Sequence, residues 1–350
     1  MKKKVALISG CTGQDGSILT RLLLEQDYEV HGIIRRSSTF NTSRIDDLMD
    51  DGLIYNKKLF LHHGDLTDSS NLGSLVSTIK PDVCYNLGAQ SHVKVSFEVP
   101  EYTADVDGVG VLRLLDAIIK HSPKTRFYQA STSEMFGGLS NEMPKNGYVE
   151  STPFHPRSPY GAAKLYGYWI TKNYREAYNL FGSNGILFNH ESYYRGETFV
   201  TRKITKWCAK FHNDRSIKPL QLGNLNAFRD WGHAEDFCRA MMLIMDHDKP
   251  DDWVVATGET HTVKEFINKC FEWMDIGKIE WSGKGLNEVA FLNGRVIIQV
   301  NEKFFRPSEV DVLLGDSSKI RSKLGWKPKY DFNSLVANMM SMELKYHNKI

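Results

Sequence analysis

The sequence predicts an α/β fold in which a doubly wound parallel sheet is joined to a smaller mixed α/β domain. Two observations lead to this prediction. In the first half of the chain, short apolar runs alternate with longer amphipathic stretches, and a glycine-rich turn at residues 10–16 follows the first apolar run. Strands that alternate with helices usually pair in parallel. Ligands of such sheets bind outside the carboxyl ends of the strands, so we expect a site there.

The elements follow from apolar spacing. Short apolar runs predict five strands: residues 5–8, 28–34, 59–62, 83–87 and 126–130. Apolar side chains at helical intervals predict helices, the clearest of which cover residues 17–26 and 108–121. After about residue 184 the alternation becomes less regular, although residues 185–188 still predict a strand and residues 200–211 a helix.

We place the main domain boundary near residue 188. The first domain then spans residues 1–188, and the chain returns to it at about 231–256, where a helical pattern precedes a short apolar run. Residues 189–230 and 257–350 form the smaller domain.

Composition excludes several classes of function. The 350 residues carry 44 Lys and Arg against 42 Asp and Glu, a net charge of +2, which favours neither nucleic acid nor an anionic membrane as a partner. The five cysteines form no CxxC pair and are typical of free thiols in a reducing compartment. The apolar run after the basic residues 2–4 is too short for a signal peptide, and no stretch approaches the ~20 residues of a membrane span. We expect a cytoplasmic protein that uses no metal.

A G-x-x-G-x-x-G pattern lies between the first predicted strand and the first predicted helix. Glycines there permit a tight turn and let a pyrophosphate approach the helix N-terminus. The pattern alone is also compatible with a turn that binds nothing. Its candidate cofactor residues are Gly10, Thr12, Gly13, Gln14, Asp15 and Gly16.

The end of the second strand favours NADP over NAD. Enzymes that use NAD usually place an acidic residue there, and Glu29 lies too early on the strand to serve. The strand is instead followed by Arg35, Arg36, Ser37 and Ser38. Guanidinium and hydroxyl groups suit a 2′-phosphate, although a solvated basic turn would look the same.

The next two strands end in further candidate cofactor residues. Asp65, followed by Leu66, is expected near the adenine amino group. The small residues around Leu87, Ala89, Gln90 and Ser91 leave room for the cofactor to pass.

Four side chains in two segments predict the chemistry. Tyr160 and Lys164 lie four positions apart, so on a helix they share one face, and a lysine beside a phenol is expected to lower the phenol pKa. Ser158 is a good N-cap for this helix, followed by a proline at its first position. Thr132 and Glu134 follow the fifth strand and add a hydroxyl and a carboxylate. The tyrosine–lysine spacing taken alone also occurs in ordinary amphipathic helices.

These patterns resemble the extended branch of the short-chain dehydrogenase/reductase superfamily, whose first domain is a Rossmann fold. The resemblance narrows to the GDP-mannose 4,6-dehydratase family and runs from residue 3 to about 340. It rests on five segments: S-T-S-E at 131–134, P-R-S-P-Y-G-A-A-K at 156–164, N-H-E-S at 189–192, F-V-T-R-K-I at 199–204 and R-D-W-G-H-A at 229–234. The segment F-R-P-S-E-V-D at 305–311 belongs to it as well.

The resemblance implies a redox-neutral dehydration of a GDP-sugar with NADP as cofactor. Tyr160 would remove the proton of the sugar 4-hydroxyl while hydride leaves C4, with Lys164 holding the nicotinamide ribose. Glu134 would then remove the C5 proton, water would leave from C6 with help from Glu134 and Thr132, and the hydride would return to C6. The product would be a GDP-4-keto-6-deoxy sugar.

The resemblance also implies further binding residues and an oligomer. Tyr102, His190 and Arg195 would lie near the cofactor. The sugar-nucleotide site would be lined by Ser91, Thr132, Ser133, Glu134, Asn189, Val200, Lys203, Arg229, Arg306 and Glu309. Members of the family often form homo-oligomers, dimers or tetramers, in which the loop at residues 35–44 reaches toward a neighbour's cofactor.

Departures from the family pattern leave the sugar open. Tyr193 and Tyr194 replace residues of another kind, Phe228 stands before Arg229, and the segment 137–149 is a few residues longer than usual. If these aromatic residues border the sugar, they would suit a hexose extended at C6, such as GDP-D-glycero-D-manno-heptose. A sugar-nucleotide 4-epimerase is a further alternative, since it shares the tyrosine and lysine but needs no Glu134. A non-catalytic NADP sensor would be expected to lack the tyrosine–lysine pair.

Overall fold

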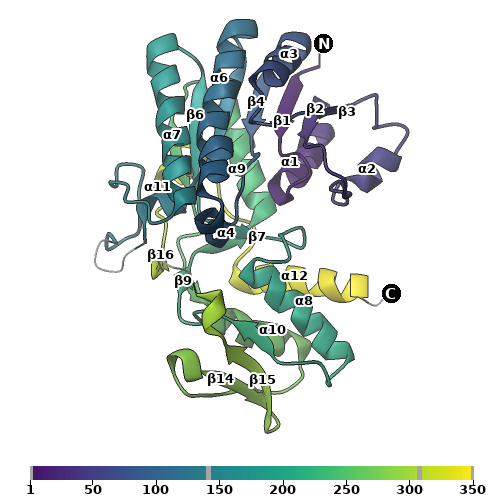
Figure 1. The fold of residues 1–350 in the computed structure, drawn as a ribbon, viewed down its shortest axis with the longest axis vertical. Helices are drawn as coiled ribbons and strands as arrows, with labels where there is room; N and C mark the ends of the chain where they lie inside the picture. Colours follow the sequence, from purple (N-terminus) through teal and green to yellow (C-terminus); the bar gives the residue numbers. More distant parts are fainter. Residues whose placement is uncertain (1–2, 139–142, 306–309, 348–350) are drawn as a thin grey trace.

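The computed structural model describes residues 3–138, 143–305 and 310–347. Its centre is a seven-stranded sheet in which every neighbouring pair is parallel (Figure 1). In spatial order the strands are β3 (Leu59–His63), β2 (Glu29–Ile34), β1 (Val5–Ser9), β4 (Val83–Asn86), β5 (Arg126–Thr132), β6 (Gly182–Leu187) and β11 (Asp252–Val255). The doubly wound parallel sheet is thereby confirmed.

The chain direction across the sheet reverses between β1 and β4. From β1 it runs outward through β2 and β3, and from β4 it runs the other way through β5 and β6. The loops after β1 and β4 therefore lie side by side at the edge where ligands of such sheets bind. Their contact is close, because a Cβ placed on Gly10 would lie 2.9 Å from the Cα of Gly88.

Helices cover both faces of the sheet. On one face α1 (Gln14–Glu25) and α9 (Ala234–Asp246) pack together over a core that includes Leu19, Phe237 and Trp253. On the other face lie α3 (Ser69–Ile79), α6 (Gly110–His121) and α7 (Pro159–Tyr178). The buried face of α6 includes Leu114, Leu115 and Ile118.

The helical stretch before α6 is longer than predicted. It begins with α5 (Pro100–Ala104), continues through a single π-helical turn, η1 (Asp105–Val109), and runs into α6 without a break. Such single π turns often occur at functional sites because they displace the side chains they carry.

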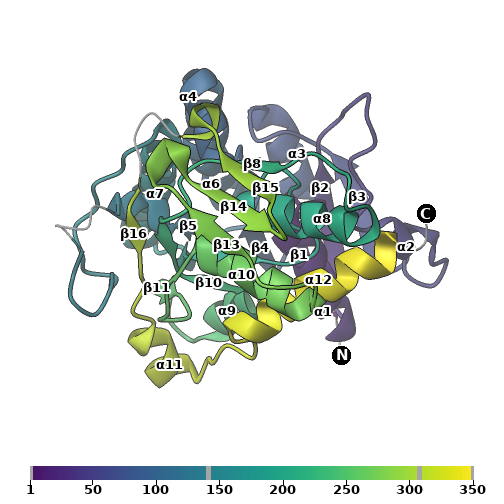
Figure 2. The same cartoon turned by 90° about the horizontal axis from the view of Figure 1, so that it is seen from below.

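The smaller part of the molecule lies beyond the carboxyl ends of the strands (Figures 1 and 2). Its four-stranded sheet consists of β13 (Glu280–Ser282), β14 (Val289–Leu292), β15 (Arg295–Val300) and β8 (Leu220–Leu222). Three helices share its core, α8 (Val200–Asn213), α10 (Val263–Met274) and α12 (Phe332–His347). The predicted helix at 200–211 is thus confirmed as α8.

Short strands connect the two parts. One pair is β7 (Asn189–Glu191) with β10 (Trp231–His233), and a second group is β12 (His261–Thr262), β9 (Phe228–Arg229) and β16 (Val312–Leu313). After β10, α9 leads back to the large sheet, where β11 pairs with β6. The predicted return of the chain near residues 231–256 is therefore seen, whereas the domain limits stay a prediction.

The remaining helical segments are short. They are α2 (Asp46–Asp50), α4 (Val93–Glu98), α11 (Ser318–Leu324), η2 (Ser133–Phe136), η3 (Gly285–Asn287) and η4 (Glu302–Phe304). All five cysteines are free and buried. Within the described ranges, no helix combines the length and the apolar character that crossing a bilayer requires.

Candidate active site

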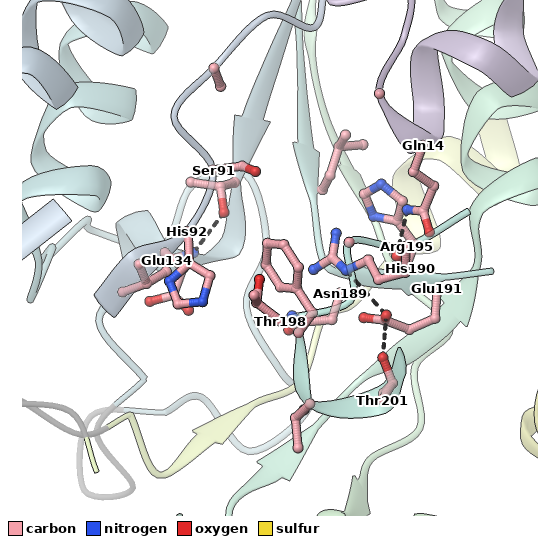
Figure 3. A pocket seen from close by; sticks show the side chains of 18 of the residues that line it. Gln14, Ser91, His92, Glu134, Asn189, His190, Glu191, Arg195, Thr198 and Thr201 are labelled. Carbon is pink, nitrogen blue, oxygen red and sulfur yellow. Dashed lines mark hydrogen bonds and ion pairs between the residues drawn. The ribbon is translucent and has the colours of Figure 1, made fainter. Parts of the chain in front are cut away.

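A cavity of about 910 Å³ lies where the carboxyl ends of β1, β4, β5 and β6 face the smaller part. It brings together most of the residues predicted from the sequence. From the predicted set, the lining residues are Gly10, Thr12, Gly13, Gln14, Asp15, Gly16, Leu87, Ala89, Ser91, Thr132, Ser133, Glu134, Tyr160, Lys164, Asn189, His190, Arg195, Val200, Lys203 and Arg229. Figure 3 shows Ser91, His92 and Glu134 on one side of this cavity and Asn189, His190 and Arg195 on the other. Among the described residues, no three His, Cys, Asp or Glu side chains are grouped as a metal site requires.

The glycine-rich turn forms a narrow cradle at the N-terminus of α1. Gly10 has φ +71°, and its carbonyl accepts a hydrogen bond from the Gly13 amide at 2.9 Å. A Cβ on Gly16 would lie 2.2 Å from the Gly10 carbonyl oxygen, so glycine is required there. The turn therefore leaves the first amides of α1 accessible to an anion.

His190 links this cradle to β7. Its Nε2 lies 2.7 Å from Asp15 Oδ2 and its Nδ1 lies 2.7 Å from the Phe188 carbonyl, so both ring nitrogens have partners within the protein. Burial lowers the pKa of His190, but the Asp15 carboxylate more than offsets this and the net pKa is raised. The amide of Gln14 donates to the His190 carbonyl at 3.0 Å, which strengthens the same link.

Tyr160 lies in the first turn of α7, as predicted. The Ser158 hydroxyl accepts a hydrogen bond from the Gly161 amide at 3.0 Å and caps the helix, and Pro159 occupies its first position. Thr132 ends β5, and its hydroxyl accepts from the Glu134 amide at 3.2 Å. The Thr132 side chain lies near enough to the Tyr160 phenol to lower the pKa of that phenol, so the phenol lies beside the end of β5.

Burial dominates the pKa values of the tyrosine–lysine pair. Burial raises the pKa of the Tyr160 phenol, and the nearby carboxylate of Asp107 raises it further, whereas Thr132 lowers this pKa only in part. Burial also lowers the pKa of Lys164, whose Nζ donates to the Ala130 carbonyl at 3.1 Å. In the chain by itself the phenol pKa is therefore raised overall, because spacing gives no sign of how strongly this site is desolvated, and the effect of Lys164 on the phenol stays a prediction.

Glu191 and Thr201 line the cavity although sequence reasoning did not single them out. The Thr201 hydroxyl donates to Glu191 Oε2 at 2.5 Å, and the guanidinium of Arg195 lies 3.2 Å from the same oxygen (Figure 3). Glu191 is only 2% exposed. Both residues belong to segments that carry the family resemblance. The sequence of such a segment does not show which side chains a glutamate within it will bind.

The side of the cavity toward the smaller part is basic. Lys203 donates to the Gln221 carbonyl at 2.6 Å and lies 3.7 Å from the centre of the Phe304 ring. Burial, and then the charge of Lys303, lower the pKa of Lys203 to about 8. Arg306 and Glu309 lie outside the described residues.

Comparisons with known proteins place the chain. A family model described as GDP-mannose 4,6 dehydratase matches residues 7–339. The chain belongs to this family. It is similar to GDP-mannose 4,6 dehydratase of Drosophila melanogaster, with 53% identity over 99% of this chain and 88% of that protein. The human protein of the same name is 54% identical over 98% of this chain and 92% of its own length.

Solved structures at lower identity share the fold. UDP-glucose 4-epimerase of Thermotoga maritima superposes with a TM-score of 0.80 at 22% identity and covers 99% of this chain and 100% of its own. A dTDP-glucose 4,6-dehydratase from Bacillus anthracis reaches 0.79 at 18% identity and covers 99% of this chain and 98% of its own.

The residues at the end of β2 lie apart from the cavity of this GDP-mannose 4,6-dehydratase family member. Arg35, Arg36, Ser37 and Ser38 are exposed and do not line it, and Arg35 donates to the hydroxyl of Tyr102 at 2.6 Å. Four other predicted cofactor residues also lie outside the lining: Asp65, Leu66, Gln90 and Tyr102. Their proposed role at the cofactor stays a prediction.

Arg44 lines the cavity and was missed. It donates to the Thr12 carbonyl at 3.3 Å and to the Tyr194 carbonyl at 2.7 Å. Arg44 lies in a loop eight residues beyond the predicted Arg36, and no motif around it indicated that its side chain would line the cavity.

The three aromatic departures from the family pattern do not border the cavity. Tyr193 stacks on Tyr346 at 4.7 Å and on the guanidinium of Arg202, and Tyr194 packs against the core of the large sheet. Phe228 is 41% exposed and also lies outside the lining. The expectation that these three aromatic residues border the sugar pocket is wrong, because each of their side chains has other surroundings: the Tyr346–Arg202 stack, the core of the large sheet or solvent.

Proposed function

We propose that this chain is a GDP-mannose 4,6-dehydratase that uses NADP. It would convert GDP-mannose to GDP-4-keto-6-deoxymannose and water. The observation that carries the proposal is the joint presence of Tyr160 and Glu134 in one cavity, beside Thr132 and Lys164. A dehydratase needs two acid–base groups at adjacent carbons, whereas an alcohol oxidation needs one.

The residues present fit a dinucleotide. The glycine cradle would be filled by any Cβ on Gly16, and it opens at the N-terminus of α1, where a pyrophosphate is bound in folds of this kind. Arg35 and Arg36 with their neighbouring serines support NADP over NAD. Titration with both dinucleotides tests the choice, and equal affinity would contradict it. Bound NADP would accept the sugar hydride and later return it, and the positive charge of its oxidised ring would favour the phenolate of Tyr160.

Each catalytic side chain has one task in this scheme. Tyr160, as phenolate, takes the proton of the sugar 4-hydroxyl when C4 is oxidised. Thr132, which is held at the end of β5, donates a hydrogen bond to the oxygen that becomes the ketone. The ketone makes the C5 proton acidic, and Glu134 takes it.

The protons balance within the site. Glu134 passes its proton to the departing 6-hydroxyl, which leaves as water, and Tyr160 returns its proton to C5 as C6 is reduced. No net proton is exchanged with solvent, which suits groups as buried as Glu134 and Tyr160, 7% and 9% exposed. Lys164 keeps a positive charge beside the phenolate and can hold a ribose hydroxyl.

The alternatives differ in a product that can be weighed. The chain is incubated with GDP-mannose and NADP, and the product is examined by mass spectrometry and NMR. A dehydratase product lacks one water and gains a C6 methyl group, whereas an epimerase product keeps the substrate mass. The same dehydration of GDP-D-glycero-D-manno-heptose is tested in parallel. Because Tyr193, Tyr194 and Phe228 do not line the cavity, we expect GDP-mannose to turn over faster.

We further propose that the chain is a cytoplasmic homo-oligomer. Helix α7 exposes Tyr166 and Trp169, and Val109 of η1 is exposed as well. A second copy would cover these apolar side chains. The loop at residues 35–44, whose Phe40 is fully exposed, would reach toward a neighbour. Light scattering tests this proposal, and a monomer at micromolar concentration would contradict it.

A further inference from the structure

A buried carboxylate in η1 has no assigned task. Asp107 is 1% exposed. Its Oδ1 accepts a hydrogen bond from the Gln90 amide at 2.7 Å, whereas its Oδ2 has no hydrogen-bond partner among the described residues. Leaving a buried carboxylate oxygen unpaired is costly, so the oxygen requires an explanation.

The π turn brings Asp107 against the helix that carries the catalytic pair. A Cβ on Gly167 of α7 would lie 3.2 Å from the Asp107 carbonyl oxygen, and one on Gly108 would lie 3.4 Å from the Ala163 carbonyl oxygen. The two backbones therefore meet on either side of Lys164. This approach depends on the two glycines and on the extra residue of the π turn.

Charge completes the observation. Lys164 is 4% exposed, and its ammonium has one hydrogen bond in the described protein, to Ala130. Burial lowers the pKa of Lys164, and Asp107 is the strongest influence that raises it. Conversely, burial raises the pKa of Asp107 to about 6, and Lys164 is the strongest influence that lowers it. Each of these two groups is therefore the opposite charge that acts most strongly on the pKa of the other.

We propose that Asp107 is a positioning residue for the reaction, whose carboxylate holds Lys164 as an ammonium ion beside Tyr160 and fixes it to the loop after β4 through Gln90. This proposal rests on the proposed function and adds to it a residue that acts through Lys164. The carboxylate keeps the lysine charged in a site where burial would otherwise favour the neutral amine. The same negative charge acts on the Tyr160 phenol and opposes its ionisation.

Other charged groups lie on the elements around this trio, and the experiment changes only one of them, Asp105, in the control variant. They are Asp15 of α1, Glu134 of η2, Arg195 of the loop after β7, and the Asp105–Arg113 pair of η1 and α6. Asp15 is paired with His190, and Asp105 lies 2.7 Å from Arg113 near the surface.

The experiment compares Asp107→Asn with Asp105→Asn. Both exchange a carboxylate for an amide in the same π turn, but Asp105 has its own partner in Arg113. The pH profile of kcat/KM for GDP-mannose is measured for both variants and the unaltered chain. This profile should have one limb from the ionisation of Tyr160 and one from that of Lys164. In Asp107→Asn we expect both limbs to move to lower pH by about one unit, because the negative charge of Asp107 raises the pKa of the phenol and of the ammonium alike. Asp105→Asn should leave both limbs in place.

A purely structural role for Asp107 would lower the plateau without moving either limb, and that result overturns the proposal. If Asp107→Asn does not fold, the charge pairing is measured on the intact carboxylate instead. With 13C-labelled aspartate, Lys164→Met should raise the pH at which the buried Asp107 carboxyl titrates, and an unchanged titration overturns the proposal. This second measurement uses no substrate, so it remains decisive even if GDP-mannose is not turned over.

Discussion

A buried ion pair anchors the C-terminal helix, and its removal should be costly. Arg202 of α8 and Glu343 of α12 lie 2.6 Å apart, with side chains only 7% and 3% exposed. Thr205 donates a further hydrogen bond to Glu343 at 3.2 Å, and the ring of Tyr193 covers the guanidinium at 3.9 Å. The substitution Glu343→Leu leaves a guanidinium buried without its carboxylate.

The expected magnitude follows from this burial. Removing one partner of a buried pair typically costs about 3–5 kcal/mol. An entropy of unfolding of about 2.1 cal/mol/K per residue gives roughly 0.7 kcal/mol/K for the 350-residue chain. The melting temperature should therefore fall by about 4–7 °C, if the chain unfolds in one transition. Circular dichroism during heating measures it.

Two further variants make the test discriminating. The double variant Arg202→Met with Glu343→Leu should recover most of the loss, because apolar replacement of a whole buried pair is often near neutral. Glu272→Leu removes an exposed pair with Lys269 on α10 and should change stability by less than about 1 kcal/mol. The reasoning is refuted if Glu343→Leu costs no more than Glu272→Leu, or if the double variant loses the sum of both changes.

Further predictions concern the cofactor cradle and its link to β7. Gly16→Ala should abolish dinucleotide binding in equilibrium titration, because the added Cβ would lie 2.2 Å from the Gly10 carbonyl oxygen. The control Gly52→Ala should bind normally, since a Cβ there meets no atom within 4 Å. Equal binding by both variants would contradict this prediction. His190 has a raised pKa and Asp15 a lowered one, so their pair stabilises the fold between these values. The free energy of unfolding should fall as pH rises through the raised histidine pKa, and His190→Asn should flatten that decline; an unaltered slope would show that the pair contributes nothing.

Much of the large parallel sheet and its ligand-binding edge could be predicted, because these features depend on short sequence patterns. The alternating apolar runs predicted the parallel sheet, and the structure has it. The three glycines predicted a tight turn before α1, and Ser158 predicted the start of α7; the structure has both. The carboxyl ends of parallel strands necessarily meet at one edge, so Thr132 and the glycine-rich turn were expected in the same site.

The rest depends on packing that spacing does not encode. Asp107 lies against α7 from within a π turn, and no sequence pattern indicated this turn before α6. Tyr193 follows a binding motif but turns toward Tyr346, more than 150 positions away along the chain. The pKa of Tyr160 is controlled by burial, which depends on every segment around it.

The central claim is that one site oxidises C4, eliminates water and reduces C6. Its most direct test is a single turnover of GDP-mannose by Glu134→Gln, in which NADPH is followed by absorbance and the sugar by mass spectrometry. We predict that NADPH and a 4-keto sugar that retains its water accumulate together, because Tyr160 still oxidises C4 while the C5 proton has no base. Tyr160→Phe should show neither signal. Normal release of the dehydrated product by Glu134→Gln would contradict the account.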